Sequence, residues 1–377
     1  MNMESYTLQP KRIKEGRLFR GLTQENLADA ISVTKQAISQ YETGVLTPTL
    51  EVITQIADML DFPQQYFSKP YRNEILTPVF FRKRKTSTKK LTEIFRTYID
   101  WMADIYTYIE QDIHLPDLKL LTYDRVGYTR REISDIARSV RRDMGLGDGP
   151  ISNLTLLLEN NGVIVSKVGL DAKKVDACSV FFTAPGVAGR PMIFLTSGTS
   201  AVRSRRDLAH ELGHQVLHSW MDKDQFEEHQ DTIEEEAELF ASYFLMPEQA
   251  MQRESYAVKN LDALLLMKAR WGASAQSILY HLAGCNCIPE STAARLKTAL
   301  YRKGWRTKEP GDESIQQERP ELIKDAITVM VDNNIKTRTE ILDDLSLPAE
   351  DAAGLCGVGT NFFMLPKEVR PKLRLVT

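Results

Sequence analysis

The sequence predicts a mainly α-helical protein with a small β-sheet, an α+β fold. Three observations lead to this prediction. Apolar residues recur at helical spacing, between short polar turns, through the first 68 residues. Three short apolar runs rich in β-branched and aromatic residues follow between Val163 and Gly198. Helical periodicity then resumes toward the C-terminus. The chain of 377 residues is long enough for two or three domains.

The bulk properties exclude several classes of protein. Net charge is −3, which gives the whole chain no nucleic-acid signal. The first residues lack the apolar core of a secretory signal, and no apolar run approaches the ~20 residues of a membrane span. Four cysteines in a chain of this length indicate a reducing compartment without a disulfide framework. We therefore expect a cytoplasmic protein that does not bind membranes.

The N-terminal segment predicts four short helices. The first ends at Gly21, and Thr23 is a fair cap for the second. Thr34 caps the third, which Gly44 ends. Two short helices joined by a tight turn are typical of a helix-turn-helix, whose second helix enters the major groove with its N-terminal residues at the base edges. The DNA-contacting residues predicted here are Thr34, Lys35, Gln36, Ser39 and, near the edge of that face, Gln40.

The stretch "LTQENLADAISVTKQAISQYETGVLTPTLEVITQIADML" resembles the Xre-type helix-turn-helix family almost end to end. The resemblance implies DNA binding, and because single units read short half-sites we expect a homodimer on a pseudo-palindromic operator. The alternative is a helical bundle that binds protein. Residues 1–68 carry six Lys/Arg against eight Asp/Glu, and this slightly acidic balance keeps the alternative open.

Residues 69–96 form a basic stretch, with nine Lys/Arg against two acids. The stretch is either a solvated linker or a source of phosphate contacts for the adjacent DNA-binding segment. It includes one extended piece at "PVFFRK". An amphipathic helix is predicted from about Lys90 to Asp112. Two further helices lead to the three strands, "VIVSKV", "ACSVFFTAP" and "RPMIFLTSG".

The stretch "RRDLAHELGHQVLH", Arg205 to His218, carries a possible metal site. Residues four apart share one face of a helix, so His210 and His214 project side by side. Two imidazoles one turn apart fit the tetrahedral coordination of Zn²⁺, and Glu211 can take a proton from water as general base. This is the chemistry of an HExxH motif. The alternative is a helix that contains His, Glu and His by chance.

A catalytic zinc needs a third protein ligand. The helix predicted in "DTIEEEAELFASYFLMP" offers four glutamates. We favour Glu234 as the ligand, with Glu236 the runner-up, and we expect Glu235 on a solvated face. Glu238 lies one turn after Glu234 and can brace a ligand histidine. Arg203, Arg205 and Arg206 form structural pairs or anchor a substrate carboxylate.

These two helices together look like the ImmA/IrrE metallopeptidase family, over about Arg131 to Pro247. The resemblance implies His210 and His214 as zinc ligands, Glu211 as base and Glu234 as third ligand. The family usually has Asn or Asp where this chain has Glu238, which puts catalysis in more doubt than zinc binding. We predict four parts: residues 1–68, the Xre-type domain; 69–130, a basic linker and long helix; 131–305, a zincin-like metallopeptidase domain; 306–377, a small, mostly helical region.

Proteins of this combined type typically inactivate a repressor by cutting it. The resemblance thus implies a DNA-binding zinc metalloprotease that cleaves a repressor or similar regulatory protein and derepresses phage, mobile-element or stress genes. One alternative is a transcription factor whose zincin-like domain senses a ligand or partner and cuts nothing. A third hypothesis is an antitoxin-like binding protein. The residues themselves indicate only DNA binding and zinc-dependent hydrolysis.

Overall fold

The fold is α+β, as predicted, with many helices and one small sheet. The computed structural model describes residues 7–70, 80–81, 89–171 and 177–364. Most of the basic stretch, including residues 82–88, lies outside these ranges. The chain divides into two compact units, each described here by itself. One contains Met1–Asn73, Thr88–His114 and Ile323–Thr377, and the other contains Glu74–Ser87 and Leu115–Leu322.

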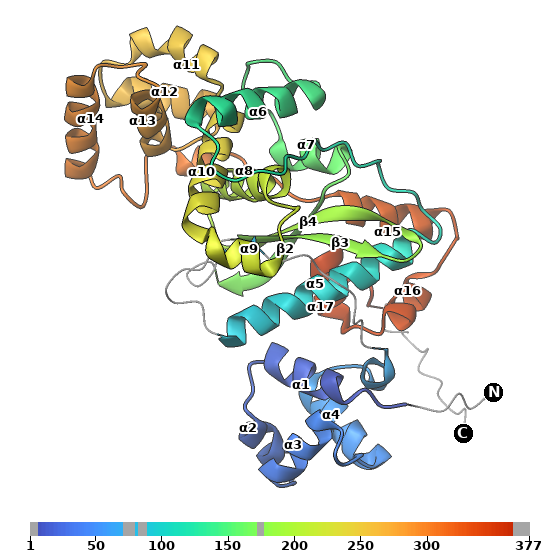
Figure 1. Cartoon of the computed structure of the whole chain (residues 1–377). Coiled ribbons are helices and arrows are strands. Elements are labelled where there is room, and N and C mark those ends of the chain that lie inside the picture. The colour runs from blue at the N-terminus through green and yellow to red at the C-terminus, as the bar shows by residue number, and fades with distance from the viewer. Residues whose placement is uncertain (1–6, 71–79, 82–88, 172–176, 365–377) are drawn as a thin grey trace, which may run out of the picture. The chain divides into compact units, whose positions relative to one another are not determined.

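The first unit is helical. Threonine caps begin α2, α3 and α4, with Thr23, Thr34 and Thr49 accepting hydrogen bonds from backbone N–H groups. Gly44 ends α3 with a φ of 76°, a conformation that suits glycine. The elements are α1 Pro10–Phe19, α2 Gln24–Ala30, α3 Lys35–Thr43, α4 Leu50–Leu60, the 3-10 turn Gln64–Ser68, α5 Lys89–Ile109, α15 Leu322–Asp332, α16 Arg338–Leu345 and α17 Ala349–Cys356 (Figure 1).

Aromatic side chains and buried ion pairs hold this first unit together. Trp101 of α5 is fully buried, with its ring centroid 4.4 Å from that of Phe19 in α1. Arg17 and Glu42 form a buried ion pair at 2.5 Å that joins α1 to α3. Arg20 of α1 binds Asp351 of α17 at 2.9 Å. The last helices of the chain therefore belong to the same unit as the first. A division of the sequence into consecutive segments does not show this grouping.

The second unit is built on a four-stranded sheet in the order β1-β3-β4-β2. The three predicted strands are present, and a fourth comes from the predicted extended piece, of which only Phe80–Phe81 is described. β3 and β4 are antiparallel, β2 is parallel to β4, and β1 is antiparallel to β3. The strands are β1 Phe80–Phe81, β2 Ile164–Asp171, β3 Ala177–Ala184 and β4 Val187–Ser197 (Figure 1).

Most helices of the second unit share one apolar core with the sheet, and Phe226 of α9 belongs to a smaller cluster with Met221 and Ile233. α8 packs on β3 and β4, and α10 packs on α8 and α6. Within the described residues, no helix is both long and apolar enough to cross a membrane. The helices are α6 Arg130–Asp143, α7 Leu154–Asn160, α8 Ala201–Leu217, α9 Lys223–Glu228, α10 Gln230–Leu245, α11 Glu248–Glu254, α12 Leu261–Trp271, α13 Ala275–Gly284 and α14 Glu290–Arg302, with 3-10 turns at Ser255–Ala257 and Asp312–Ser314.

Candidate metal centre

The close approach of α8 and α10 brings the predicted site residues together. Gly213 lies on α8 between the two histidines of the motif. A Cβ atom at Gly213 would lie 3.1 Å from Cα of Ala237 and 3.1 Å from Cδ1 of Phe240 in α10. These contacts are tighter than ordinary packing allows, so the absent side chain lets the two backbones approach. Glu234, almost one turn before Ala237, then reaches the histidines.

His210, His214 and Glu234 form a group that could hold a metal ion. The two Nε2 atoms lie 3.2 Å apart. Oε2 of Glu234 lies 3.4 Å from His210 Nε2, and Oε1 of the same carboxylate lies 3.5 Å from His214 Nε2. Both histidines are almost fully buried, and Oε1 of Glu234 is buried without a hydrogen bond. The two imidazoles and the carboxylate thus lie together, and Glu234 as third ligand stays a prediction.

The spacing of the two imidazoles fits a tetrahedral metal. Ligand atoms at roughly 2.0–2.1 Å from zinc lie about 3.3–3.4 Å from one another along the edges of a tetrahedron. The two Nε2 atoms, 3.2 Å apart, are close to that separation, and each faces one oxygen of the Glu234 carboxylate. Oε1 of Glu234 is buried without a hydrogen-bond donor, and a bound cation would satisfy it. The residues present therefore fit a zinc ion, and the roles assigned to them remain predictions.

A chain of hydrogen bonds behind His214 fixes its tautomer. Glu236 accepts hydrogen bonds from the backbone N–H groups of Gly127 and Tyr128, at 2.8 and 2.6 Å. Its Oε2 lies 2.9 Å from His218 Nε2, and His218 Nδ1 lies 3.1 Å from His214 Nδ1. Since the carboxylate only accepts, His218 Nε2 donates to it and His218 Nδ1 accepts from His214. The lone pair of His214 Nε2 then faces the metal position.

His210 has a carboxylate behind it as well. Its Nδ1 lies 3.6 Å from Oε2 of Glu238, while Arg206 binds Oε1 of Glu238. Burial lowers the pKa of His210, but the carboxylates of Glu234 and Glu238 outweigh it and raise that pKa to about 9. Burial alone dominates at His214 and lowers its pKa to about 3. Glu238 thus lies beside His210 at a distance longer than a hydrogen bond, and its bracing role stays a prediction.

Glu211 lies on the sheet side of α8. Its side chain is 1% exposed, and the hydroxyl of Ser179 in β3 donates to its Oε2 at 2.6 Å. Burial raises the pKa of Glu211 to about 7, against the opposing effects of His210 and the Ser179 hydrogen bond. A carboxyl group with a pKa near neutrality is suited to proton transfer at physiological pH. Glu211 is thus chemically able to act as the predicted base.

Sequence reasoning missed two of these positions. Ser179 stands in an apolar strand and carries no periodic signal. His218 is the C-cap of α8, and it is fully buried and connects His214 to Glu236. Glu236, the runner-up ligand, turns away from the metal group. Their alignment depends on α10 crossing α8, which spacing along one helix does not predict.

The three arginines of α8 have separate partners. Arg205 is buried and binds Glu318 and the carbonyl of Ile151, so it is a structural residue. Arg203 lies 3.7 Å from Asp207, one turn along the helix. Arg206 binds Oε1 of Glu238, whose Oε2 faces His210.

The predicted DNA-contacting residues begin α3 in the other unit. Thr34, Lys35 and Gln36 are exposed, and Ser39 and Gln40 are half-buried. The Thr34 hydroxyl accepts from the backbone N–H of Ala37 at 3.1 Å and so serves as the helix cap. Lys35 lies 3.9 Å from Glu25 across the turn. The arrangement of α2 and α3 is that of a helix-turn-helix.

Two family models match this chain. One, described as an IrrE N-terminal-like domain of a peptidase family, matches residues 162–283, which include β2, β3, β4, α8 and α10. The other, described as helix-turn-helix, matches residues 13–67. The chain therefore combines a helix-turn-helix domain with an IrrE-like domain. The metal group lies wholly inside the IrrE-like domain.

Two curated relatives, both named as HTH-type transcriptional regulators, match short stretches of this chain. An uncharacterized HTH-type transcriptional regulator YqaE of Bacillus subtilis is 33% identical over 64 residues, 17% of this chain and 55% of that protein. The SPbeta prophage-derived uncharacterized HTH-type transcriptional regulator YonR, from the same organism, is 29% identical over 59 residues, 16% of this chain and 55% of that protein. The chain thus spans about half the length of these relatives.

Proposed function

We propose that this protein is a DNA-binding transcriptional regulator whose IrrE-like domain is a zinc-dependent endopeptidase. The observation that carries the proposal is the group of two imidazoles and one carboxylate that could hold a metal ion, with Glu211 next to His210 in the sequence. His210, His214 and Glu234 would hold the zinc ion, which supplies Lewis acidity when bound. The substrate we propose is a repressor or similar regulatory protein.

The chain's own residues divide the chemistry among them. Glu211 would accept a proton from the attacking water and pass it to the leaving amine, a role for which its raised pKa suits it. Ser179 holds the Glu211 carboxylate in place through Oε2. The Glu236–His218 chain keeps His214 neutral with Nε2 toward the ligand position. The side chains of Glu211 and His214 are therefore each held in one orientation by their hydrogen bonds.

DNA binding is proposed for the helix-turn-helix domain. Lys35 and Gln36 are exposed at the start of α3, where side chains of such helices meet base edges and phosphates. Because one domain reads a short half-site, we propose a homodimer on a pseudo-palindromic operator. The names of the two relatives, one from a prophage, support a regulatory role in phage or mobile-element genes. A DNA ligand also supports a cytoplasmic location.

A second candidate is a regulator whose IrrE-like domain senses a ligand and cuts nothing. One observation favours it: Glu211 is buried, and its Oε2 already accepts a hydrogen bond from Ser179. In this case the metal would have a structural role, and Glu211 would not act in proton transfer.

Incubation of the zinc-loaded protein with regulators encoded beside its gene tests the proposal. The endopeptidase should produce two fragments of one regulator, and a chelator should stop the cleavage. If every neighbouring regulator stays intact with stoichiometric zinc in the protein, the sensing function is supported instead.

A further inference from the structure

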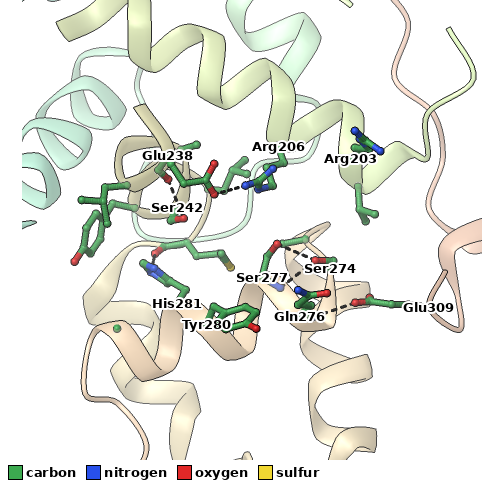
Figure 2. Close-up of a pocket in the computed structure, with 18 of the residues that line it drawn as sticks. Arg203, Arg206, Glu238, Ser242, Ser274, Gln276, Ser277, Tyr280, His281 and Glu309 are labelled. Atoms are coloured by element: carbon green, nitrogen blue, oxygen red, sulfur yellow. Dashed lines mark hydrogen bonds and ion pairs between the residues drawn. The ribbon is translucent and has the colours of Figure 1, made fainter. Parts of the chain in front are cut away.

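A cavity of about 980 Å³ lies beside the metal centre, within the second unit. Its walls come from α8 and α10 on one side and from α13 on the other, and Figure 2 shows labelled side chains of these helices facing the space between them. The metal-facing residues His210, His214 and Glu234 do not line it. Cavities of roughly 300–1,000 Å³ hold small organic ligands in proteins.

The charges on the cavity wall are not balanced. Four guanidinium groups line it, from Arg130, Arg203, Arg206 and Arg306, against three carboxylates. Two of these carboxylates, on Glu309 and Asp312, both bind the buried ammonium group of Lys268.

The third carboxylate is also engaged, since Glu238 binds Arg206. Arg203 lies near Asp207. Arg130 and Arg306 form no ion pair with a carboxylate of the described residues. The cavity therefore has cationic groups to offer an anion.

Neutral groups add hydrogen-bonding capacity and apolar contact. Ser242 of α10 and Ser277 and Gln276 of α13 carry polar side chains on the wall (Figure 2). Tyr280 and Trp305 present aromatic rings to the same space. Guanidinium and hydroxyl donors bind phosphate or carboxylate oxygens, and aromatic rings suit a planar apolar body.

We propose that this cavity binds a small organic anion, with a phosphate or carboxylate group held by the arginines and a planar body against the aromatic side chains. The site also contacts the metal centre through one side chain. Arg206 holds Oε1 of Glu238, and Oε2 of Glu238 faces His210 Nδ1 at 3.6 Å, with neither of these two atoms in a hydrogen bond.

Coupling to the metal follows from this geometry. An anion that accepts hydrogen bonds from Arg206 competes with Glu238 for that guanidinium. Glu238 is then free to close on His210 Nδ1 and to orient the imidazole for metal binding. The anion and zinc therefore raise each other's affinity, because coupling between two sites is reciprocal. The coupling rests on the proposed metal site, whereas anion binding does not.

Calorimetric titration of the full chain tests the binding. The probes are adenosine monophosphate and citrate, with adenosine as the uncharged match for the first. At least one anion should bind, and adenosine should bind about tenfold more weakly than its monophosphate, or worse, because a charge-assisted contact is lost. Arg130→Ala and Arg306→Ala should each weaken anion binding by a similar factor, whereas Arg302→Ala, on α14 outside the cavity lining, should leave it unchanged.

Several results would overturn the assignment. These are no binding by either anion, equal binding of adenosine and its monophosphate, or binding that survives both arginine variants. Binding of an acidic peptide where neither free anion binds would also reject a small-molecule site and assign the cavity to a protein segment.

Zinc affinity, measured by competition with a chelator, tests the coupling. The bound anion should raise the zinc affinity of the wild-type protein. Glu238→Gln should keep anion binding, since it leaves the arginines in place, but lose this increase. Circular dichroism checks that the variant folds. An increase that persists in Glu238→Gln would reject the coupling route and leave the binding site standing, and a chain that binds no zinc would reject the metal site instead.

Discussion

The metal group and the outer face of α3 both present polar side chains on a helix, but they differ in burial. His210, Glu211 and His214 are 2%, 1% and 1% exposed, whereas the side chain of Lys35 is 63% exposed. Burying a polar group costs free energy unless a partner satisfies it, and an exposed one costs almost nothing. A buried polar cluster therefore needs a specific explanation, and its residues can be assigned one by one. The role of an exposed polar face can be assigned only from the partner that binds it.

Loss of the two ligand histidines should have the largest effect. His210→Ala with His214→Ala removes two of three donor atoms, so the bound zinc should disappear altogether. Elemental analysis of the purified protein measures it. His114→Ala is the matched control, because that side chain is 96% exposed and outside the metal group. Stoichiometric zinc retained by the double variant would show that the metal binds elsewhere.

His281 tests the effect of burial on a histidine that lies outside the metal group. Burial, with help from Arg130, lowers its pKa to about 4, against a hydrogen bond to the Met246 carbonyl. In the unfolded chain this imidazole has a pKa near 6.5, so it binds a proton there first as the pH falls. The contribution of the neutral, buried His281 to the free energy of unfolding is therefore complete above about pH 6.5 and is lost as the pH falls toward 4. The loss is on the order of 3 kcal/mol.

Urea unfolding at several pH values measures this loss. In His281→Gln the free energy of unfolding should fall less steeply between pH 6.5 and 4 than in the wild type. His114→Gln, at an exposed histidine, should follow the wild-type curve. Identical slopes for all three proteins would mean that His281 is not held neutral by burial.

Glu236 and Glu235 are adjacent on α10 and differ in burial, the first being 2% exposed. Glu236→Gln weakens the chain that orients His214, so zinc affinity should fall by roughly 10–100-fold. Glu235→Gln should leave zinc affinity unchanged, because that side chain is exposed. Chelator competition compares the two. Equal affinities would remove the orienting role from Glu236.

The exposed face of α3 should give the smallest effects per residue. Gln36→Ala should cost about 1–3 kcal/mol of discrimination if Gln36 reads a base edge. Lys35→Ala should weaken binding to all sequences alike and reduce the salt slope by about 1, as expected for a phosphate contact. Titration with operator and random DNA at several salt concentrations separates the two outcomes. If both variants behave like wild type, α3 is not the recognition helix.

The sequence predicts local features of both regions well, because caps and periodicity are local. Thr23, Thr34 and Thr49 begin their helices as such residues should, and His210 and His214 share a face because four residues make about one turn. Long-range contacts escape the same reasoning. Ser179 meets Glu211 only because β3 lies against α8.

The segment around residues 309–318 shows the same limit. It has the composition of a solvated loop, yet Glu309 is buried and accepts hydrogen bonds from the N–H groups of Ala275 and Gln276 at the start of α13. Glu318 does the same for Leu154 and Thr155 of α7. Composition cannot tell an acid that faces water from one that caps a distant helix.

The most direct test of the proposed protease function is Glu211→Gln. The amide keeps the shape of the side chain and can still accept from Ser179, but it cannot take a proton from water. Zinc content and DNA binding should be unchanged, while cleavage of the target regulator should fall by about 10²–10⁴-fold, and the controlled promoter should stay shut on induction. A variant that holds zinc, lacks cleavage and still releases the promoter would contradict proteolysis as the mechanism and establish the sensing function in its place.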